Sequence, residues 1–590
     1  MGPGRRSTEK ASLGYLKPLG SYAKKYLPAL ITVIIFSIAG TIFSILGPRF
    51  LSRITDLISV GLTGQPIDMD AVIERAITML CFYLAALLLQ FFQAFIMATI
   101  TQNTAYDLRR DLTRKINILP LRYFDNTMIG DILSRMTNDV DTISRTMSQS
   151  ISSMFSQGTQ FLGSLLLMFI TDWRLTLVAI AAAFIGFFIM IAIMSRSQKY
   201  FVAQQSELGA LNGHVEEMYN GHDVVKAYNA EARENKKFED VNGRLAQATW
   251  KSQFFAGIMM PIMGFIANLG YVAVCIVGAV MAMNGQITFG VIVAFMIYIR
   301  LFTNPMQQLG SVFTQLQSTA AASKRVFDFL DEEEMPDDSD VPLRLQPDEI
   351  KGNIDFEHVK FGYRPEKTII HDFNAHVKAG TKVAIVGPTG AGKTTMVNLL
   401  MRFYETDEGN IIIDGVNLKD MSRHEIHDLF GMVLQDTWLF EGSFKENIRY
   451  GKDVPDEAVI EAAKAAGIDH FIRTTPHGYD TILNENANVS QGQKQLITIA
   501  RAMVENAPFL ILDEATSSVD TRTEELIQKA MDELMKGRTS FIIAHRLSTI
   551  RDADTILVIK NGDIIEQGNH EELLAKGGFY AELYNSQFDS

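Results

Sequence analysis

Long apolar stretches fill the first 330 residues of the chain, whereas the rest alternates short apolar runs with charged segments. A helix needs about 20 apolar residues to cross the hydrocarbon layer of a membrane. The clearest stretch, LVAIAAAFIGFFIMIAIM at 177–194, carries no charge. This pattern predicts an all-α membrane domain of six helices over 1–330, followed by a soluble domain. The expected spans lie at about 27–48, 77–100, 151–170, 174–195, 254–283 and 288–303.

Two of the segments that join these spans are long, at about 101–150 and 196–253. Apolar residues recur through both at helical spacing, so the spanning helices are expected to extend far into the cytosol. An acidic segment with prolines, DEEEMPDDSDVPLRLQPDE, begins at residue 331 and predicts a linker over 331–350. The soluble domain then covers 351–590.

Basic residues are distributed unevenly between the two sides of the predicted spans. The segment after the second span reads DLRRDLTRK, and the segment after the fourth begins SRSQK. The loop GLTGQPIDMDAVIE, between the first and second spans, has no Lys or Arg. Because cytoplasmic loops are enriched in Lys and Arg, both termini are expected in the cytosol. Polar residues within the spans, such as Gln157 and Gln160, are expected either to bond neighbouring helices or to line a cavity.

The formal net charge of the chain is −13. It argues against a nucleic-acid partner, because binding a phosphate backbone requires a basic surface. The chain has two cysteines, Cys81 and Cys275, and both lie in apolar segments. The soluble domain has no cysteine, as expected of a protein that faces a reducing compartment.

In the soluble domain, the apolar strand KVAIV runs into GPTGAGKTT at 387–395, and a helical pattern follows. This is the phosphate-loop pattern G-x-x-x-x-G-K-[ST] in its strand–loop–helix setting. Glycines let backbone N–H groups surround phosphates, and the start of the helix adds a favourable dipole. Lys393 is expected to reach the β- and γ-phosphates of ATP, and Thr394 to hold Mg²⁺. The predicted ATP-binding residues of the loop are Gly387, Pro388, Thr389, Gly390, Ala391, Gly392, Lys393, Thr394 and Thr395.

Two further apolar strands end in residues suited to hydrolysis. FLILDEATSSVD, at 509–520, delivers Asp513 and Glu514 at the end of its apolar run. Asp513 is expected to orient Mg²⁺, and Glu514 to act as the general base that polarises the attacking water. RTSFIIAHRL, at 538–547, delivers His545, for which the hypothesis is a catalytic contact with the γ-phosphate.

Five motifs thus follow one another: GPTGAGKTT, MVLQDTWLF, VSQGQKQLITIARA, LILDEATSSVD and IIAHRLSTI. In this order they resemble the ATPase of ATP-binding-cassette (ABC) transporters over about 351–590, and the six-helix domain extends the resemblance over nearly the whole chain. It implies an α/β P-loop ATPase domain with a helical subdomain. It also implies that the segments at 119–141 and 216–238 are coupling helices, by which a membrane domain rests on its ATPases.

The same resemblance assigns roles to further residues. Tyr363 in VKFGYR matches the aromatic residue that stacks on adenine. Gln435 matches the catalytic-loop glutamine that contacts Mg²⁺ and water. The signature sequence and a dimer-interface loop serve the ATP bound by a partner subunit. The residues that match them are Ser490, Gly492, Gln493 and Asp520.

The signature departs from its usual form. It reads VSQGQ instead of LSGGQ, so Gln491 replaces a glycine, and the stretch before it is one residue shorter than usual. The chain's own phosphate loop, Glu514 and His545 are intact. This combination resembles the intact subunit of heterodimeric bacterial exporters. It favours a second, different ABC half-transporter as partner, with a homodimer as the alternative.

The sequence therefore predicts half of an ATP-driven exporter of the multidrug type, in a bacterial plasma membrane. It would move amphipathic small molecules, either drug-like compounds or lipids, by alternating access and would use ATP and Mg²⁺. A lipid or peptide exporter with the same machinery is an alternative, as is an ATP-gated channel or regulator. The intact Glu514 favours a transporter that hydrolyses ATP.

Overall fold

The computed structural model describes residues 13–338, 340–345, 350–364, 366–434, 437–484, 489–513, 520–543 and 550–586. The chain forms two compact units. The first comprises Met1–Asn117 and Ile129–Glu332, and the second comprises Ile118–Met128 and Glu333–Ser590. A short segment of the N-terminal half therefore belongs to the same unit as the C-terminal domain.

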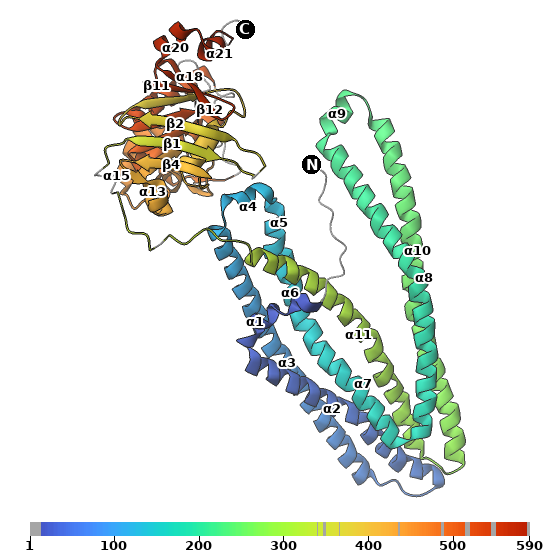
Figure 1. Ribbon diagram of the computed structural model, residues 1–590. Coiled ribbons are helices and arrows are strands. Elements are labelled where there is room, and N and C mark those ends of the chain that lie inside the picture. Colours follow the sequence, from blue (N-terminus) through green and yellow to red (C-terminus); the bar gives the residue numbers. More distant parts are fainter. Residues whose placement is uncertain are drawn as a thin grey trace. The chain divides into compact units, whose positions relative to one another are not determined.

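The described part of the first unit consists mainly of long helices (Figure 1). Two of the long helices, α8 and α10, lie side by side and are joined by the short α9. Two π-helical turns, η3 and η4, flank α6. The helices and π-turns are α1 (Leu19–Lys24), α2 (Leu27–Ser59), α3 (Met69–Ile118), α5 (Ile129–Ser134), η3 (Arg135–Asp139), α6 (Val140–Thr146), η4 (Met147–Ile151), α7 (Ser152–Thr171), α8 (Trp173–Asn220), α9 (His222–Ala227), α10 (Glu231–Met283) and α11 (Phe289–Leu330).

Among the described residues, five helices are long and apolar enough to cross a membrane, namely α2, α3, α8, α10 and α11. The sixth predicted span, 151–170, coincides with α7, whose 20 residues include Gln157 and Gln160. The prediction of a helical membrane domain is thus confirmed. At about 1.5 Å per residue, the 50 residues of α3 extend about 75 Å, whereas the hydrocarbon layer is about 30 Å thick. The long helices therefore extend well beyond a membrane.

The segment predicted as one coupling helix at 119–141 is divided in the structure. It contains α4 (Leu121–Asn126), α5 and the turn η3. Pro120 immediately precedes α4, where its missing N–H removes no helical hydrogen bond, and Thr127 is extended and ends the helix. In the segment at 216–238, α9 begins after Gly221 and separates α8 from α10.

The core of the first unit lies where α7, α8, α10 and α11 meet. Met168, Leu175 and Phe295 are fully buried there. The Gln160 side-chain amide of α7 donates a hydrogen bond to the backbone oxygen of Leu301 on α11 at 3.2 Å. At this position, a polar residue within a predicted span bonds a neighbouring helix.

The second unit contains a six-stranded sheet in the order β12-β11-β3-β10-β9-β6, in which the described pairs are parallel except β11 with β12. A second, antiparallel sheet has the order β2-β1-β4-β5, and β7 pairs with β8. The strands are β1 (Ile354–Phe361), β2 (Ile370–Val377), β3 (Lys382–Val386), β4 (Glu408–Ile413), β5 (Val416–Asn417), β6 (Phe430–Val433), β7 (Gly442–Ser443), β8 (Ile482–Leu483), β9 (Phe509–Asp513), β10 (Thr539–Ile543), β11 (Thr555–Lys560) and β12 (Asp563–Gly568).

Helices cover both faces of the six-stranded sheet, as the buried strands require. The helices α14, α15 and α16 pack near α17 and form the predicted helical subdomain. The prediction of an α/β domain with a helical subdomain is therefore confirmed. The helices of this unit are α4, α12 (Lys393–Leu400), α13 (Arg423–Leu429), α14 (Phe444–Arg449), α15 (Asp456–Ala465), α16 (Asp469–Thr474), α17 (Gln491–Glu505), α18 (Thr521–Met535), α20 (His570–Lys576) and α21 (Phe579–Ser586).

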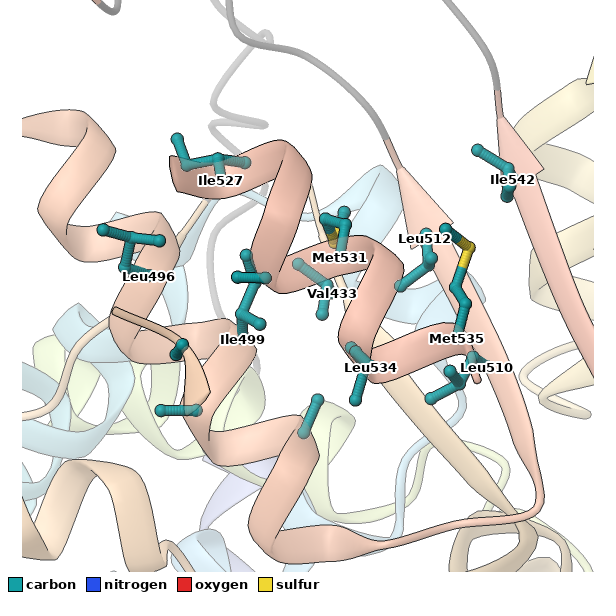
Figure 2. Packing of buried hydrophobic residues seen from close by; sticks show 14 of the residues in the cluster. Val433, Leu496, Ile499, Leu510, Leu512, Ile527, Met531, Leu534, Met535 and Ile542 are labelled. Atoms are coloured by element: carbon teal, nitrogen blue, oxygen red, sulfur yellow. The ribbon is translucent and has the colours of Figure 1, made fainter. Parts of the chain in front are cut away.

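The two faces of the sheet bury separate apolar clusters. Successive residues of a strand point to opposite faces, so Leu510 and Leu512 join one cluster and Ile511 joins the other. Figure 2 shows the first cluster, in which Ile499 of α17 and Met531 of α18 lie among the side chains between these helices and the sheet. Packing of α17 on α18 thus holds the signature helix against the strands.

We expect Ile499→Ala to destabilise the ATPase domain by about 2–5 kcal/mol, because it leaves a cavity at a fully buried position. Differential scanning calorimetry of the full-length protein should show that the melting temperature of the ATPase domain is lowered by at least about 4 °C. Ile565→Ala is the matched control, since Ile565 is 43% exposed and its truncation should change stability by less than about 0.5 kcal/mol. Equal shifts in both variants would contradict the packing described here.

Candidate active site

The loop between β3 and α12 has a shape that requires glycine at two positions. A Cβ atom on Gly387 would lie 2.2 Å from the backbone oxygen of Ile559, so no larger residue fits beside β11. Gly392 has φ 107° and forms the N-cap of α12, a conformation that L side chains rarely adopt. The loop therefore closes tightly, and the first N–H groups of α12 point toward it, as at phosphate-binding helix starts.

Lys393 begins α12 and turns back into this loop. Its side-chain ammonium donates hydrogen bonds to the backbone oxygens of Gly387 at 2.8 Å and Pro388 at 3.2 Å. The residue is only 8% exposed, and burial lowers the pKa of its ammonium, whereas the charge of Asp513 acts in the opposite direction. Lys393 thus places a positive charge in the centre of the loop and within electrostatic range of Asp513.

Asp513 reaches the loop because of the sheet topology. It is the last residue of β9, which is separated from β3 by β10. Backbone pairing aligns Ile543 of β10 with Asp513 on one side and with Ile385 of β3 on the other. Parallel strands end at the same edge of a sheet, so Asp513 and the loop 387–392 share that edge.

Three predicted catalytic residues cannot be placed in the same way. Glu514 follows β9 directly, His545 follows β10 by two residues, and Gln435 follows β6 by two residues. All three lie outside the described residues. Their roles remain predictions.

The oxygen donors at this edge suit a magnesium ion. The Thr394 side chain is exposed in the first turn of α12, and the Asp513 carboxylate ends β9. Mg²⁺ prefers such hard oxygen ligands and completes its shell with water and substrate phosphates. In the part of the chain that the structure describes, no group of three or more His, Cys, Asp or Glu residues could hold a metal. Two protein oxygen donors leave the rest of the shell to water and phosphate oxygens, so the donor set fits an ion that is bound together with a nucleotide.

Tyr363, predicted to stack on adenine, lies just after β1 and contacts α12. Its hydroxyl accepts a hydrogen bond from the Asn398 side chain at 2.9 Å and lies 3.4 Å from the Thr395 hydroxyl. Its ring packs edge-on against Tyr404, with ring centroids 4.9 Å apart. The structure thus places Tyr363 beside the helix that carries the phosphate loop.

The signature residues form the start of α17. The Ser490 hydroxyl accepts a hydrogen bond from the backbone N–H of Gln493 at 3.3 Å, and the Gln493 side chain accepts one from the Ser490 N–H at 2.9 Å. This reciprocal capping box defines the first turn. Gly492 is buried, and the exposed Gln491 donates a hydrogen bond to the Thr437 hydroxyl at 3.0 Å. The residue that replaces the usual glycine is thus fixed to the segment after β6.

Asp520 caps α18, where it accepts a hydrogen bond from the Thr523 N–H at 3.0 Å. Within the described residues, the structure gives neither Asp520 nor the signature residues a hydrogen bond or ion pair with the loop 387–395. The predicted residues therefore fall into two groups. One surrounds the chain's own phosphate loop, and the other lies at the starts of α17 and α18.

The segment 118–128 is attached to the ATPase domain beside Tyr363. The Tyr404 hydroxyl donates a hydrogen bond to the Asp125 carboxylate of α4. Burial, followed by this hydrogen bond, raises the pKa of Tyr404. The Met335 N–H also donates to the backbone oxygen of Ile118 at 3.0 Å. A cavity of about 490 Å³ lies between α4 and the domain, lined by Leu121, Arg122, Asp125, Asn126, Tyr363, Arg364, Asn398 and Tyr404.

Sequence reasoning did not single out Tyr404 or Asp125. They are 279 residues apart in the chain, and neither lies in a recognisable motif. The aromatic pair Phe403–Tyr404 directly after the phosphate-loop helix was the available signal, because an aromatic residue with a polar end is suited to an interface.

Two family models match the chain: ABC transporter transmembrane region over residues 30–306, and ABC transporter over residues 370–517. A fatty acid ABC transporter ATP-binding/permease protein of Mycobacterium bovis is 43% identical over 591 residues, covering 94% of this chain and 93% of that protein. An ATP-dependent lipid A-core flippase of Syntrophus aciditrophicus is 34% identical over 558 residues and covers 92% of each chain. The solved structure of a bacterial Atm1-family ABC exporter with ATP bound matches with a TM-score of 0.73 at 27% identity, covering 96% of this chain and 98% of that one.

A helical membrane unit joined to a phosphate-loop ATPase defines an ATP-driven transporter. The chain belongs to the ABC transporter family and is a half-transporter, with one transmembrane domain and one nucleotide-binding domain. Its ATPase domain binds and hydrolyses ATP, and this hydrolysis is coupled to transport.

We expect Tyr404→Phe to loosen α4 from the ATPase domain, because it removes the hydrogen bond to Asp125 and keeps the ring. A partly exposed hydrogen bond contributes about 0.5–1.5 kcal/mol, which corresponds to roughly two- to tenfold faster amide exchange. Hydrogen-exchange mass spectrometry of the full-length protein should show this increase in peptides that cover 121–126. Tyr450→Phe, at an exposed tyrosine of the same domain, should leave these peptides unchanged. Identical exchange in both variants would show that Tyr404 does not hold α4.

Proposed function

We propose that this chain exports amphipathic small molecules by alternating access, as one half of a dimeric ABC transporter. The observation that most directly supports this proposal is that the Lys393 side chain turns into the loop 387–392, with Asp513 at the same sheet edge. The same chain also supplies the membrane helices. The names of two relatives, a fatty acid transporter and a lipid A-core flippase, support cargo with both polar and apolar parts. Drug-like amphiphiles fit the same description.

The chemistry that we propose follows from the charges at this edge. Lys393 neutralises the β- and γ-phosphates, and backbone N–H groups of 387–395 with the start of α12 bind them. Tyr363 stacks on the adenine ring. Glu514 takes a proton from the attacking water, and His545 contacts the γ-phosphate. Thr394 and Asp513, with Gln435, would hold Mg²⁺, which would supply further positive charge beside the phosphates.

The proposed link to the membrane helices is α4 for the first coupling segment and α9 for the second. Support for α4 comes from its hydrogen bond to Tyr404, which in turn packs on Tyr363. A change in the position of Tyr363 on nucleotide binding would therefore act on α4 through direct contacts. For α9 the support is its place as a short helix between α8 and α10.

We propose that a second half-transporter completes two ATP sites, each of which joins the phosphate loop of one subunit to the signature of the other. Ser490, Gly492, Gln493 and Asp520 would then serve the partner's ATP. The substitution at Gln491, set against an intact phosphate loop, supports a heterodimer with unequal sites. The bias of Lys and Arg toward the segments after the second and fourth spans supports a bacterial plasma membrane orientation with cytosolic ATPase domains.

We expect Glu514→Gln to retain ATP binding but to slow hydrolysis at least a hundredfold, because a general base contributes about 10²- to 10⁴-fold. Binding is measured with a fluorescent ATP analogue and turnover by phosphate release, both on the assembled transporter. Glu505→Gln, at the end of α17, is the control and should hydrolyse ATP normally. Near-normal turnover in Glu514→Gln would show that Glu514 is not the base.

Unequal sites predict unequal effects of two substitutions in this chain. Lys393→Ala should abolish most hydrolysis by the assembled transporter, because it disables the site that pairs with the partner's signature. Gln491→Gly should change the total rate less than about twofold, because its site contributes little turnover. Both rates are measured on the complex purified with its natural partner. A chain that assembles with itself and has two equally active sites would contradict the asymmetry and leave the transporter assignment intact.

A further inference from the structure

A pair of arginines lines a cavity near one end of the membrane unit. Arg49 and Arg53 are one helical turn apart on α2, and therefore lie on the same face of that helix. With residues of α7 and α11 they surround a space of about 220 Å³. The apolar part of its wall comes from Leu167, Ile170 and Ala294. The cavity thus combines two positive charges with an apolar surface.

Within the described residues, no carboxylate lies within ion-pair distance of Arg49 or Arg53. The nearest acidic residue along α2, Asp56, is engaged elsewhere: its two oxygens accept hydrogen bonds from the Gly290 N–H at 2.7 Å and the Thr288 hydroxyl at 2.9 Å. Asp56 therefore stabilises the start of α11 and leaves the two guanidinium groups without an anion.

A second polar group nearby also lacks a partner. Tyr298 of α11 is fully buried, and its hydroxyl has no hydrogen-bond partner among the described residues. Tyr298 lies one helical turn after Ala294, which lines the cavity, so the two residues share a face of α11. Buried polar groups without partners are rare and costly, so an unsatisfied hydroxyl on the helix face that reaches the cavity supports a place for an additional polar group there.

An exposed tryptophan close to the cavity indicates where it lies relative to the membrane. Thr171 lines it and is followed two residues later by Trp173, whose side chain is 57% exposed. Exposed tryptophans concentrate where lipid headgroups meet water. The predicted topology puts this end of α2 outside, on the side that is normally depleted in Arg. Arginines at the end of a span can simply extend to the interface, but such residues do not need to share a cavity.

We propose that Arg49 and Arg53 bind the acidic headgroup of an amphiphile, a carboxylate or a phosphate, whose hydrocarbon chain lies along Leu167, Ile170 and Ala294. Guanidinium groups bind both anions with two parallel hydrogen bonds. The cavity is smaller than the roughly 300–1,000 Å³ of drug-sized pockets, so it accommodates the headgroup and the first methylenes. The cargo of the transporter is therefore an anionic lipid-like molecule, an assignment that depends on the export function proposed above.

The test uses the full-length transporter in phosphatidylcholine nanodiscs and a photoreactive palmitate analogue. Labelling of peptides from 152–171 is quantified by mass spectrometry against increasing concentrations of unlabelled competitors. The wild type should be protected by oleate or by oleoyl lysophosphatidate, and at least tenfold less effectively by oleyl alcohol. The more effective of the two acids identifies the headgroup as carboxylate or phosphate. Protection by oleyl alcohol at the same concentration as both acids would overturn the proposal.

Variants separate a charge effect from a structural one. The double substitution Arg49→Gln with Arg53→Gln should raise the half-protecting concentration of the better acid at least tenfold. Arg49→Lys with Arg53→Lys keeps the charges but loses the paired guanidinium hydrogen bonds, so it should raise this concentration by less than the double Gln substitution does. Arg75→Gln, a control arginine of α3 outside the cavity, should label like the wild type. Unchanged protection in the double Gln variant, verified as folded by size-exclusion chromatography and thermal unfolding, would overturn the proposal.

If the double Gln variant does not fold, Arg49→Gln and Arg53→Gln are measured separately, and each should raise the half-protecting concentration at least threefold. Failure of the export function has a different signature. ATP-driven movement of the palmitate analogue is measured in proteoliposomes made from the same preparations. Specific labelling without ATP-driven movement would support the headgroup site and contradict export of this cargo. Equal ATP-driven movement by the wild type and the double Gln variant would contradict the headgroup site and leave the exporter standing.

Discussion

The parallel alignment of β3, β10 and β9 is the constraint on which the ATPase domain depends. Ile543 is paired with Asp513 and with Ile385, so three strands end level with one another. A slip of β9 by one residue would turn Leu512 away from its cluster and direct the Asp513 carboxylate to the opposite face. Both faces of the sheet bury apolar side chains, so such a slip would place a charged group in the apolar core, which is energetically unfavourable. The apolar packing thus fixes the register, and the register positions Asp513 next to the phosphate loop.

Side chains, and not the strands of the sheet, connect the phosphate-loop helix α12 to α4. Asn398 on α12 bonds Tyr363, Tyr363 packs on Tyr404, and Tyr404 bonds Asp125 of α4. Each contact is modest, at about 0.5–1.5 kcal/mol for a hydrogen bond or an aromatic pair. Contiguity alone does not establish coupling, which needs an element whose two states are biased by both sites. The short α4, bounded by Pro120 and an extended Thr127, is the separate helical element that the proposed coupling requires.

The sequence was sufficient where the functional residues are close together in the chain. The loop 387–395 and the pair Asp513–Glu514 are contiguous motifs that follow apolar strands, and the fold that they predicted is confirmed. Prediction failed where contacts join distant segments. Tyr404 with Asp125 and Asp56 with Gly290 carry no local signal, because each pair depends on how separate elements pack.

Both proposed sites hold positive charge near apolar surface, but the protein treats the charges differently. At the phosphate loop, the carbonyl groups of Gly387 and Pro388 accept hydrogen bonds from Lys393, so the protein itself satisfies the buried ammonium and keeps the loop in shape. Around Arg49 and Arg53 it supplies no such oxygen within the described residues, and Asp56 is held by α11 instead. A buried cation that already donates hydrogen bonds to backbone oxygens is stable in the absence of a phosphate. An arginine pair without such oxygens is stabilised most by an anion that carries a hydrocarbon chain. The anionic group of this ligand pairs with the guanidinium groups, and its chain covers the apolar wall of the cavity.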